Sequence, residues 1–283
     1  MPADLAIVTD STAYLPQQAV DRQRISVVPL SVVLGDEVLA EGVEITPKDV
    51  AEALRAKERL TTSRPNPETF AAAYRAAAES GASGVVSIHL SAELSGTVEA
   101  ARLAAAEAPV PVRVVDSRLV GMALGYAVLA ATDARAAGGD LAAVAAAAEL
   151  RASGTAGFFY VDTLEHLRRG GRIGTARALL GSALAVKPLL HLAGGRIEPL
   201  EKVRTAARAI ARLEELAVER AGEQEVDITV HHLAAEDRAE PLAARLRERV
   251  PGVREVLLTE VGAVIGTHVG PGLLAVVVAP AVG

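Results

Sequence analysis

The segment 261–272, Val-Gly-Ala-Val-Ile-Gly-Thr-His-Val-Gly-Pro-Gly, combines one histidine with a backbone rich in glycine. His268 is its only titratable side chain, and an imidazole can donate, accept or transfer a proton near neutral pH. Gly266, Gly270 and Gly272 let the backbone take positive φ and let another group approach closely. The spacing predicts a loop that positions His268. A hydrogen-bonded histidine in a tight turn would fit the same residues equally well.

Three other segments place small hydroxyl groups where a strand is expected to give way to a helix. In open parallel sheets, ligands bind beyond the carboxyl ends of the strands, where free N–H groups and the helix dipole attract an anion. Any one of these hydroxyls could be a plain helix N-cap. Together they predict a site for a small anionic head group, with Ser95-Gly96 as its strongest part because glycine lets the ligand approach the backbone. The residues of this predicted site are Asp10, Ser11, Thr62, Ser63, Ser91, Ser95 and Gly96.

A hydrolase can also be assembled from the same residues. Ser95 would be the nucleophile, His268 the base, and Asp10 or Asp116 the carboxylate that orients the base. The Gly-x-Ser-x-Gly elbow of the α/β-hydrolases is absent. A serine hydrolase acting on acyl esters therefore stands as the alternative function.

The composition of the 283 residues excludes several other classes of function. With a net charge of −6 and 2% aromatic residues, the chain lacks the basic surface and the stacking platforms of nucleic-acid-binding proteins. It has no cysteine, which excludes disulfides, thiolate metal sites and cysteine nucleophiles. No bound metal is expected, because the adjacent His231 and His232 would face opposite sides of a strand. No cofactor is expected either, since Gly181–Lys187 lacks the second glycine of a phosphate loop.

The location is expected to be cytoplasmic. The first ten residues contain neither a basic region nor a long apolar run of the kind found in export signals. No stretch reaches 18 apolar residues free of charges or breaks, so no stable membrane insertion is expected.

The order of the expected elements predicts an α/β protein of two domains. Residues 1–152 alternate short apolar runs with Ala-rich helical patterns, which indicates a mostly parallel sheet with flanking helices. Residues 153–283 read as an α+β domain with a largely antiparallel sheet. Thr46-Pro47 is a typical helix start, and a helix is also expected over 175–184.

The glycine-rich stretch Gly170-Gly171-Arg172-Ile173-Gly174 follows an amphipathic run. It could be an ordinary solvated turn. It could also be a docking element that places Arg172 against a phosphate or an acidic partner surface.

Taken together, these segments resemble the DegV family, whose characterised members are bacterial fatty-acid-binding proteins that serve a fatty acid kinase. The matching pieces follow the family's order and span nearly the whole chain. They are Val8-Thr-Asp-Ser11, Thr62-Ser-Arg-Pro65, Leu94-Ser-Gly-Thr97, Val115-Asp-Ser117, Leu167-Arg-Arg-Gly-Gly-Arg-Ile173, Lys187-Pro188 and Gly266-Thr-His-Val-Gly-Pro-Gly272.

The resemblance implies a non-catalytic carrier that buries a long-chain fatty acid and holds its carboxylate with Thr62, Ser95, Gly96 and His268. Arg172 would contact a separate ATP-dependent fatty acid kinase, and the acyl phosphate product would pass to an acyltransferase toward phospholipid synthesis. Two departures concern the head group: Arg64 stands where the family usually has Gln, and His89 where Ser is common. A related fold serves the dihydroxyacetone kinases, which gives a third hypothesis, a binder of small hydroxyketones or phosphosugars.

Overall fold

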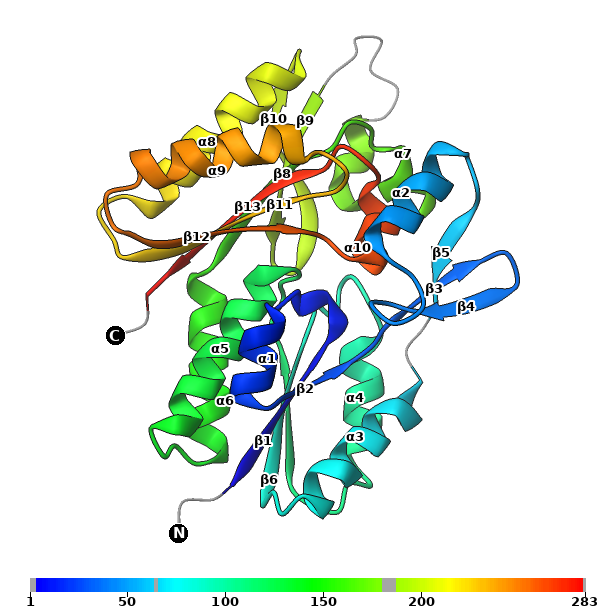
Figure 1. Ribbon diagram of the computed structural model, residues 1–283, viewed down its shortest axis with the longest axis vertical. Helices are drawn as coiled ribbons and strands as arrows, with labels where there is room; N and C mark the ends of the chain where they lie inside the picture. The colour runs from blue at the N-terminus through cyan, green and yellow to red at the C-terminus, as the bar shows by residue number, and fades with distance from the viewer. Residues whose placement is uncertain (1–3, 64–65, 180–186, 282–283) are drawn as a thin grey trace. The chain divides into compact units, whose positions relative to one another are not determined.

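The chain forms two compact units in the computed structural model, which describes residues 4–63, 66–179 and 187–281 (Figure 1). The first unit comprises Met1–Ser31 and Ser63–Gly154, and the second comprises Val32–Thr62 and Thr155–Gly283. The division between the units after Gly154 falls two residues after the predicted domain boundary at residue 152. The segment 32–62, expected in the first domain, groups instead with the second unit, for reasons given below.

The first unit is built on four parallel strands in the order β2-β1-β6-β7. Their apolar residues are buried on both faces, as in β1, where Ile7 and Val8 point to opposite sides and are both fully inaccessible. The strands are β1 (Leu5–Asp10), β2 (Ile25–Val28), β6 (Gly84–His89) and β7 (Val112–Asp116).

Helices cover both faces of this sheet, as the strand–helix alternation predicts (Figure 1). On one face α3 and α4 pack over Val8 and Val85 through Phe70, Tyr74 and Ala101. On the other face α5 and α6 contact β1, β6 and β7. The helical elements are the 3-10 turn η1 (Ser11–Ala13), α1 (Gln17–Gln23), α3 (Pro67–Glu79), α4 (Thr97–Ala105), α5 (Met122–Ala136) and α6 (Leu141–Gly154).

A six-stranded sheet forms the centre of the second unit, in the order β10-β9-β8-β13-β11-β12. Only the β11–β12 pair is parallel, so the sheet is mostly antiparallel, as predicted. The strands are β8 (Ala156–Tyr160), β9 (Lys187–Ala193), β10 (Arg196–Val203), β11 (Val226–His232), β12 (Val253–Glu260) and β13 (Leu274–Pro280).

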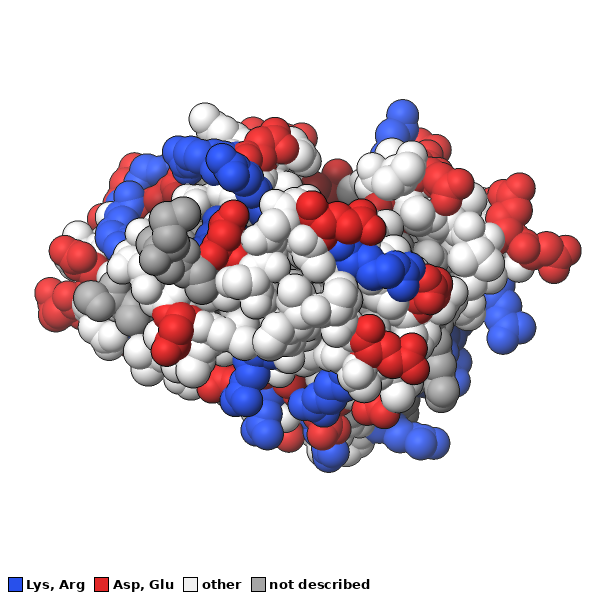
Figure 2. Space-filling view, turned by 90° about the horizontal axis from the view of Figure 1, so that it is seen from below, with Lys and Arg blue, Asp and Glu red and all other residues white. Residues whose placement is uncertain are grey.

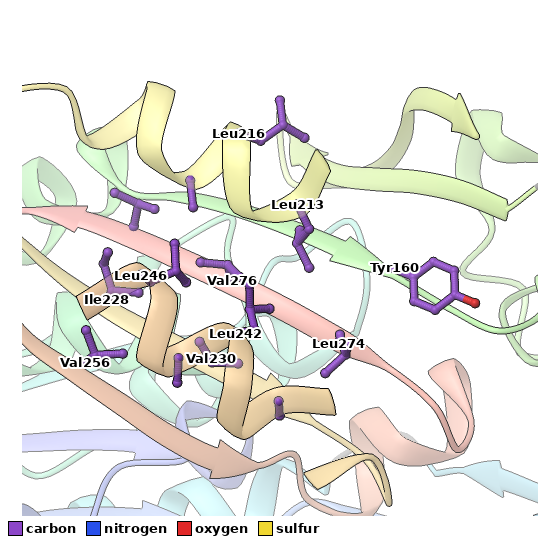
Figure 3. Packing of buried hydrophobic residues seen from close by; sticks show 14 of the residues in the cluster. Tyr160, Leu213, Leu216, Ile228, Val230, Leu242, Leu246, Val256, Leu274 and Val276 are labelled. Carbon is purple, nitrogen blue, oxygen red and sulfur yellow. The ribbon is translucent and has the colours of Figure 1, made fainter. Parts of the chain in front are cut away.

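Two long helices, α8 (Ala206–Ala221) and α9 (Glu236–Arg249), cover one face of that sheet. Figure 3 shows Leu213 and Leu242 of these helices packed against Ile228, Val230 and Val276 of the strands. Burial of each such side chain contributes about 1.5–3 kcal/mol relative to exposure. This core makes the sheet a rigid base for the loops and short helices at its edge.

Residues 32–62 form a small sheet with the order β4-β3-β5 and the helix α2. The helix begins with the predicted cap, because Thr46 and Asp49 form a reciprocal capping box. The segment joins the second unit through α10: α10 contacts both α2 and β5, and the Glu41 carboxylate accepts a buried hydrogen bond from Val264 N at 2.8 Å. The elements are β3 (Ser31–Leu34), β4 (Glu37–Ala40), α2 (Pro47–Arg55) and β5 (Leu60–Thr62).

The predicted histidine loop is instead largely helical. Residues Ala263–Val269 form α10, and only the glycines after it have positive φ, at Gly270 and Gly272. Gly266 lies inside the helix, where Val50 and Leu233 leave little space for a side chain. The prediction was wrong because contacts with the rest of the unit override the weak helix propensity of Val, Thr and Gly.

Two short helical elements complete the second unit. These are α7 (Glu165–Arg169) and the 3-10 turn η2 (Gly174–Leu179). The turn replaces the start of the helix expected over 175–184, and residues 180–186 lie outside the described part of the chain. Within the described residues no helix has both the length and the apolar character needed to cross a membrane.

Candidate functional site

Thr62 and His268 meet in the second unit, 206 residues apart in sequence. Thr62 is the last residue of β5, and its pairing with Val32 fixes the strand end. His268 lies in the last turn of α10. The two side chains are hydrogen bonded, with 3.0 Å between Thr62 Oγ1 and His268 Nε2. The structure thus brings together two of the predicted carboxylate-binding residues.

His268 is neutral at physiological pH. Burial lowers its pKa to about 4, with a smaller contribution from the positive charge of Arg172. A neutral imidazole carries one N–H. The Nδ1 atom is buried and has no hydrogen-bond partner among the described residues. A proton on Nδ1 would therefore leave a buried donor unsatisfied, at a cost of about 1–3 kcal/mol.

The proton of His268 is accordingly assigned to Nε2, which donates to Thr62 Oγ1. This arrangement has a chemical consequence at Thr62. Its oxygen already accepts a hydrogen bond, so its own hydroxyl hydrogen is left to donate to a further acceptor. The Thr62 side chain is partly buried. The pair is therefore a neutral donor suited to an anionic oxygen.

Ser95 and Gly96 lie in the first unit, at the start of α4. Ser95 Oγ lies 2.8 Å from Thr97 Oγ1, and its backbone N–H donates to Ser91 O. Gly96 is the N-cap residue, is exposed, and has open space around the position where a Cβ would stand. Both residues present polar groups at a helix N-terminus, and their role in carboxylate binding stays a prediction.

The remaining residues predicted to support the pocket all have local structural partners. Ser91 Oγ accepts from Glu93 N and closes a turn. Ser11 Oγ accepts from Leu30 N, which joins the loop after β1 to the segment after β2. Ser63 N donates to Ser31 O. These contacts hold the loops in place, and any direct contact with a ligand stays a prediction.

Asp10 belongs to a fully buried hydrogen-bond network at the end of β1. Its Oδ2 accepts from His89 Nδ1 and from Leu90 N, both at 3.0 Å, and its Oδ1 accepts from Thr12. The other ring nitrogen of His89 bonds Ser87 Oγ at 2.7 Å. Asp10 therefore ties the loop after β1 to the loop after β6.

Tyr74 extends this network by donating its hydroxyl to Ser87 Oγ at 2.9 Å. Burial raises the pKa of Tyr74 to about 12, so the hydroxyl remains a donor. Ser87, His89 and Asp10 have the connectivity of a hydrolytic triad, but all three are fully inaccessible. In the sequence, His89 stands out only as a departure from the family. The signal that could have linked His89 to Ser87 is their spacing, which places both side chains on one face of β6.

The geometry gives no support to the alternative hydrolase. The two carboxylates considered for orienting His268 are engaged elsewhere: Asp10 binds His89, and Asp116 accepts from Ala92 N and Arg118 N. In the described chain, His268 Nδ1 meets no carboxylate that could orient it as a base.

His231 and His232 are the adjacent histidines that the sequence offered as metal ligands. Both are buried on β11, and burial lowers the pKa of His231 to about 4. Across the residues that the structure describes, no group of three or more His, Asp or Glu side chains could hold a metal ion.

Arg172 lies in the turn after α7 and is only partly exposed. Its Nη1 donates to Gly170 O at 2.6 Å. Arg64, one of the two departures from the family pattern, lies outside the described residues. On the face displayed in Figure 2, Lys and Arg lie interspersed with Asp and Glu.

The fold defines an α/β protein that combines a four-stranded parallel sheet with a six-stranded mixed one. The family model described as "Uncharacterised protein, DegV family" matches residues 4–281. The chain therefore belongs to the DegV family.

Relatives and solved structures support this assignment over the full length. A DegV domain-containing protein of Streptomyces coelicolor is 65% identical over 278 residues, 98% of this chain and 99% of that protein. The structure described as "Fatty Acid Binding of a DegV family Protein from Thermus thermophilus" has a TM-score of 0.92 at 38% identity, covering 98% of this chain and 100% of that one. DegV of Bacillus subtilis, described as a fatty acid binding protein, has a TM-score of 0.90 at 34% identity, covering 99% and 100%.

Proposed function

We propose that this protein binds a long-chain fatty acid and that the Thr62 hydroxyl donates a hydrogen bond to its carboxylate. The observation that carries the proposal is the hydrogen bond between Thr62 and His268. With the ring proton assigned to Nε2, the threonine oxygen accepts this bond and the hydroxyl hydrogen is left to donate. The fatty-acid-binding proteins of Thermus thermophilus and Bacillus subtilis, with the same fold at more than 30% identity, support it.

The two parts of the ligand would contribute differently. Burial of an acyl chain gains about 0.8 kcal/mol per methylene, so a sixteen-carbon chain offers on the order of 10 kcal/mol before the costs of binding. A hydrogen bond to a charged group adds about 1.5–3 kcal/mol. The chain therefore supplies most of the affinity, and the polar pair selects an acid and fixes its orientation.

Ser95 and Gly96 are proposed as further carboxylate ligands, on the strength of the family resemblance. Ser95 carries a hydroxyl, and Gly96 offers an unobstructed helix N-terminus. Replacement of Ser95 by Ala should weaken acid binding without loss of the fold. Unchanged binding would remove these two residues from the site.

We further propose that the protein is a carrier and that a separate ATP-dependent kinase acts on the bound acid. A carboxylate oxygen would attack the terminal phosphorus of ATP, with ADP leaving, to give an acyl phosphate that an acyltransferase consumes. Neutral donors suit this chemistry, because they orient the carboxylate without neutralising it as an ion pair would. The turn that carries Arg172 is the proposed contact for the kinase.

Native mass spectrometry of the purified protein tests the proposed function. We expect a co-purifying long-chain fatty acid, and we expect added palmitate to displace it with one-to-one stoichiometry. Incubation with a fatty acid kinase and ATP should then convert the bound acid to acyl phosphate, detected as a hydroxamate after trapping with hydroxylamine. Protein that is free of lipid and ignores added palmitate would contradict the proposal.

A further inference from the structure

The helices α7 and α10 lie side by side (Figure 1). Two histidines and two glycines meet where they touch. Gly170 follows the end of α7, and the ring of His268 lies against its bare Cα. Gly270 follows the end of α10, and the ring of His166 lies against it in the same way. A Cβ at either glycine would overlap the facing imidazole. The two helix ends thus hold each other through reciprocal contacts.

Gly170 is required by its lack of a side chain and not by its backbone conformation. Its φ of −73° and ψ of −8° are helical values that any residue adopts. A Cβ there would overlap Nδ1 of His268 and lie 2.8 Å from its Cε1. Gly270 differs, because its φ of 75° already favours glycine. Only Gly170 therefore isolates the effect of the missing side chain.

The backbone of Gly170 is fixed on both sides. Its N–H donates to His166 O at 2.9 Å, and its carbonyl oxygen accepts from Arg172 Nη1 at 2.6 Å. Arg172 N in turn donates to Leu167 O, and Leu167 is fully buried. The surface on which the His268 ring rests is therefore anchored to the core of the unit.

We propose that Gly170 is a positioning residue for His268, whose ring it holds with Nε2 directed at Thr62. The inference rests on the proposed function, in which this pair binds the fatty acid carboxylate. It follows that the turn 170–172 and the Thr62–His268 pair are coupled through the His268 ring. A partner that binds and displaces this turn would then change the position of the ring and the hydrogen bond to the carboxylate.

The test is the Gly170→Ala variant, compared with wild type by palmitate titration and by ¹⁵N NMR of the histidine rings. We expect at least a tenfold loss of palmitate affinity and a changed pair of ring-nitrogen shifts for His268. Gly157→Ala is the matched control, because a Cβ at Gly157 would meet only Leu192 at an ordinary 3.9 Å. Ring shifts identical to wild type in Gly170→Ala would overturn the proposal.

A double variant separates positioning from a general structural effect. In a His268→Ala background, Gly170→Ala should cause no further loss of affinity, since the ring it displaces is gone. A second tenfold loss there would contradict the proposal. If Gly170→Ala alone does not fold, His268→Ala should restore folding by removing the clash, and failure to do so would count against us.

The ring shifts are measured without ligand, so they decide this inference independently of the proposed function. If the wild-type protein binds no palmitate but the ¹⁵N shifts of the His268 ring still change in Gly170→Ala, only the fatty acid proposal is contradicted. If palmitate binds and these shifts are unaffected by Gly170→Ala, only the positioning role is contradicted.

Discussion

Each unit of the protein contains a histidine that is hydrogen bonded to a hydroxyl group, and the two differ in how completely the ring is bonded. His89 is inaccessible and uses both ring nitrogens, Nδ1 toward Asp10 and Nε2 toward Ser87. Among the described residues, His268 is hydrogen bonded only through Nε2, toward Thr62, and its Nδ1 lies against Gly170.

The difference separates the structural role of the first histidine from the proposed binding role of the second. In the first unit both carboxylate oxygens of Asp10 and both ring nitrogens of His89 are hydrogen bonded, so the network locks two loops together. In the second unit, with the proton of His268 assigned to Nε2, the hydroxyl hydrogen of Thr62 is left for another acceptor. The triad-like connectivity of Ser87, His89 and Asp10 is therefore a weak indication of catalysis. A polar group that can still form a hydrogen bond with a ligand is the better indication of a binding site.

Removal of Asp10 should have the largest effect on stability. Asp10→Ala leaves the His89 N–H, the Leu90 N–H and Thr12 without their shared acceptor in a fully buried place. We expect the free energy of unfolding in urea to fall by at least about 3 kcal/mol, since each unsatisfied buried donor costs about 1–3 kcal/mol. Asp116→Ala, which removes an acceptor from an exposed turn, is the control and should cost far less. Equal effects of the two variants would refute the structural role of the network.

The low pKa of His268 predicts a dependence of stability on pH. Its folded pKa of about 4 lies below the ordinary value of 6.5, because burial and Arg172 disfavour the charged ring. The contribution of the neutral His268 ring to the free energy of unfolding is fully present above pH 6.5. It is lost as the pH falls toward 4, because over this range the unfolded chain binds a proton at His268 and the folded chain does not. The loss is on the order of 2–3 kcal/mol.

His268→Gln should remove this contribution, because glutamine does not titrate. The measurement is the free energy of unfolding of wild type and variant at pH 7 and at pH 4.5, and the change between the two pH values is compared. We expect stability to decline less in the variant than in wild type over this range. Parallel declines would show that His268 keeps an ordinary pKa, which would contradict the prediction.

Removal of the Tyr74 hydroxyl, at the outer end of the buried network, should have the smallest effect on stability. Tyr74→Phe removes the hydroxyl that donates to Ser87 while keeping the ring in the core. We expect a loss of about 1 kcal/mol in the free energy of unfolding. Palmitate affinity should not change, because this histidine network is structural. A variant of normal stability that no longer bound the acid would reverse the assignment of the two histidines.

The sequence predicted the architecture well where local signals are strong. Alternating apolar runs and Ala-rich helices indicated the parallel sheet, and Thr46-Pro47 indicated the start of α2. Such features depend on neighbours in the chain, so they are readable without the fold.

Features that depend on distant contacts were missed. The helix α10 is made of weak helix formers and is held by Glu41 and by packing against Val50 and Leu233. The same contacts attach residues 32–62 to the second unit. No periodicity in 261–272 indicates them.

The candidate site likewise has features that the sequence indicated and features that only the fold reveals. The family resemblance pointed to Thr62 and His268, but the bond between residues 206 positions apart, and the bare Cα of Gly170 behind the ring, follow only from the fold. The roles of Ser95 and Gly96 remain predictions. The buried link from His89 to Asp10 joins neighbouring strands, and strand order is not visible in the sequence.

The most direct test compares the affinities for palmitate and for hexadecan-1-ol in wild type and in Thr62→Val, with Thr61→Val as a control. Thr61 is exposed on the same strand and lacks the contact with His268. The account predicts that Thr62→Val weakens palmitate binding by roughly tenfold or more and leaves binding of the alcohol nearly unchanged. Thr62→Val protein that binds palmitate as tightly as wild type would contradict it.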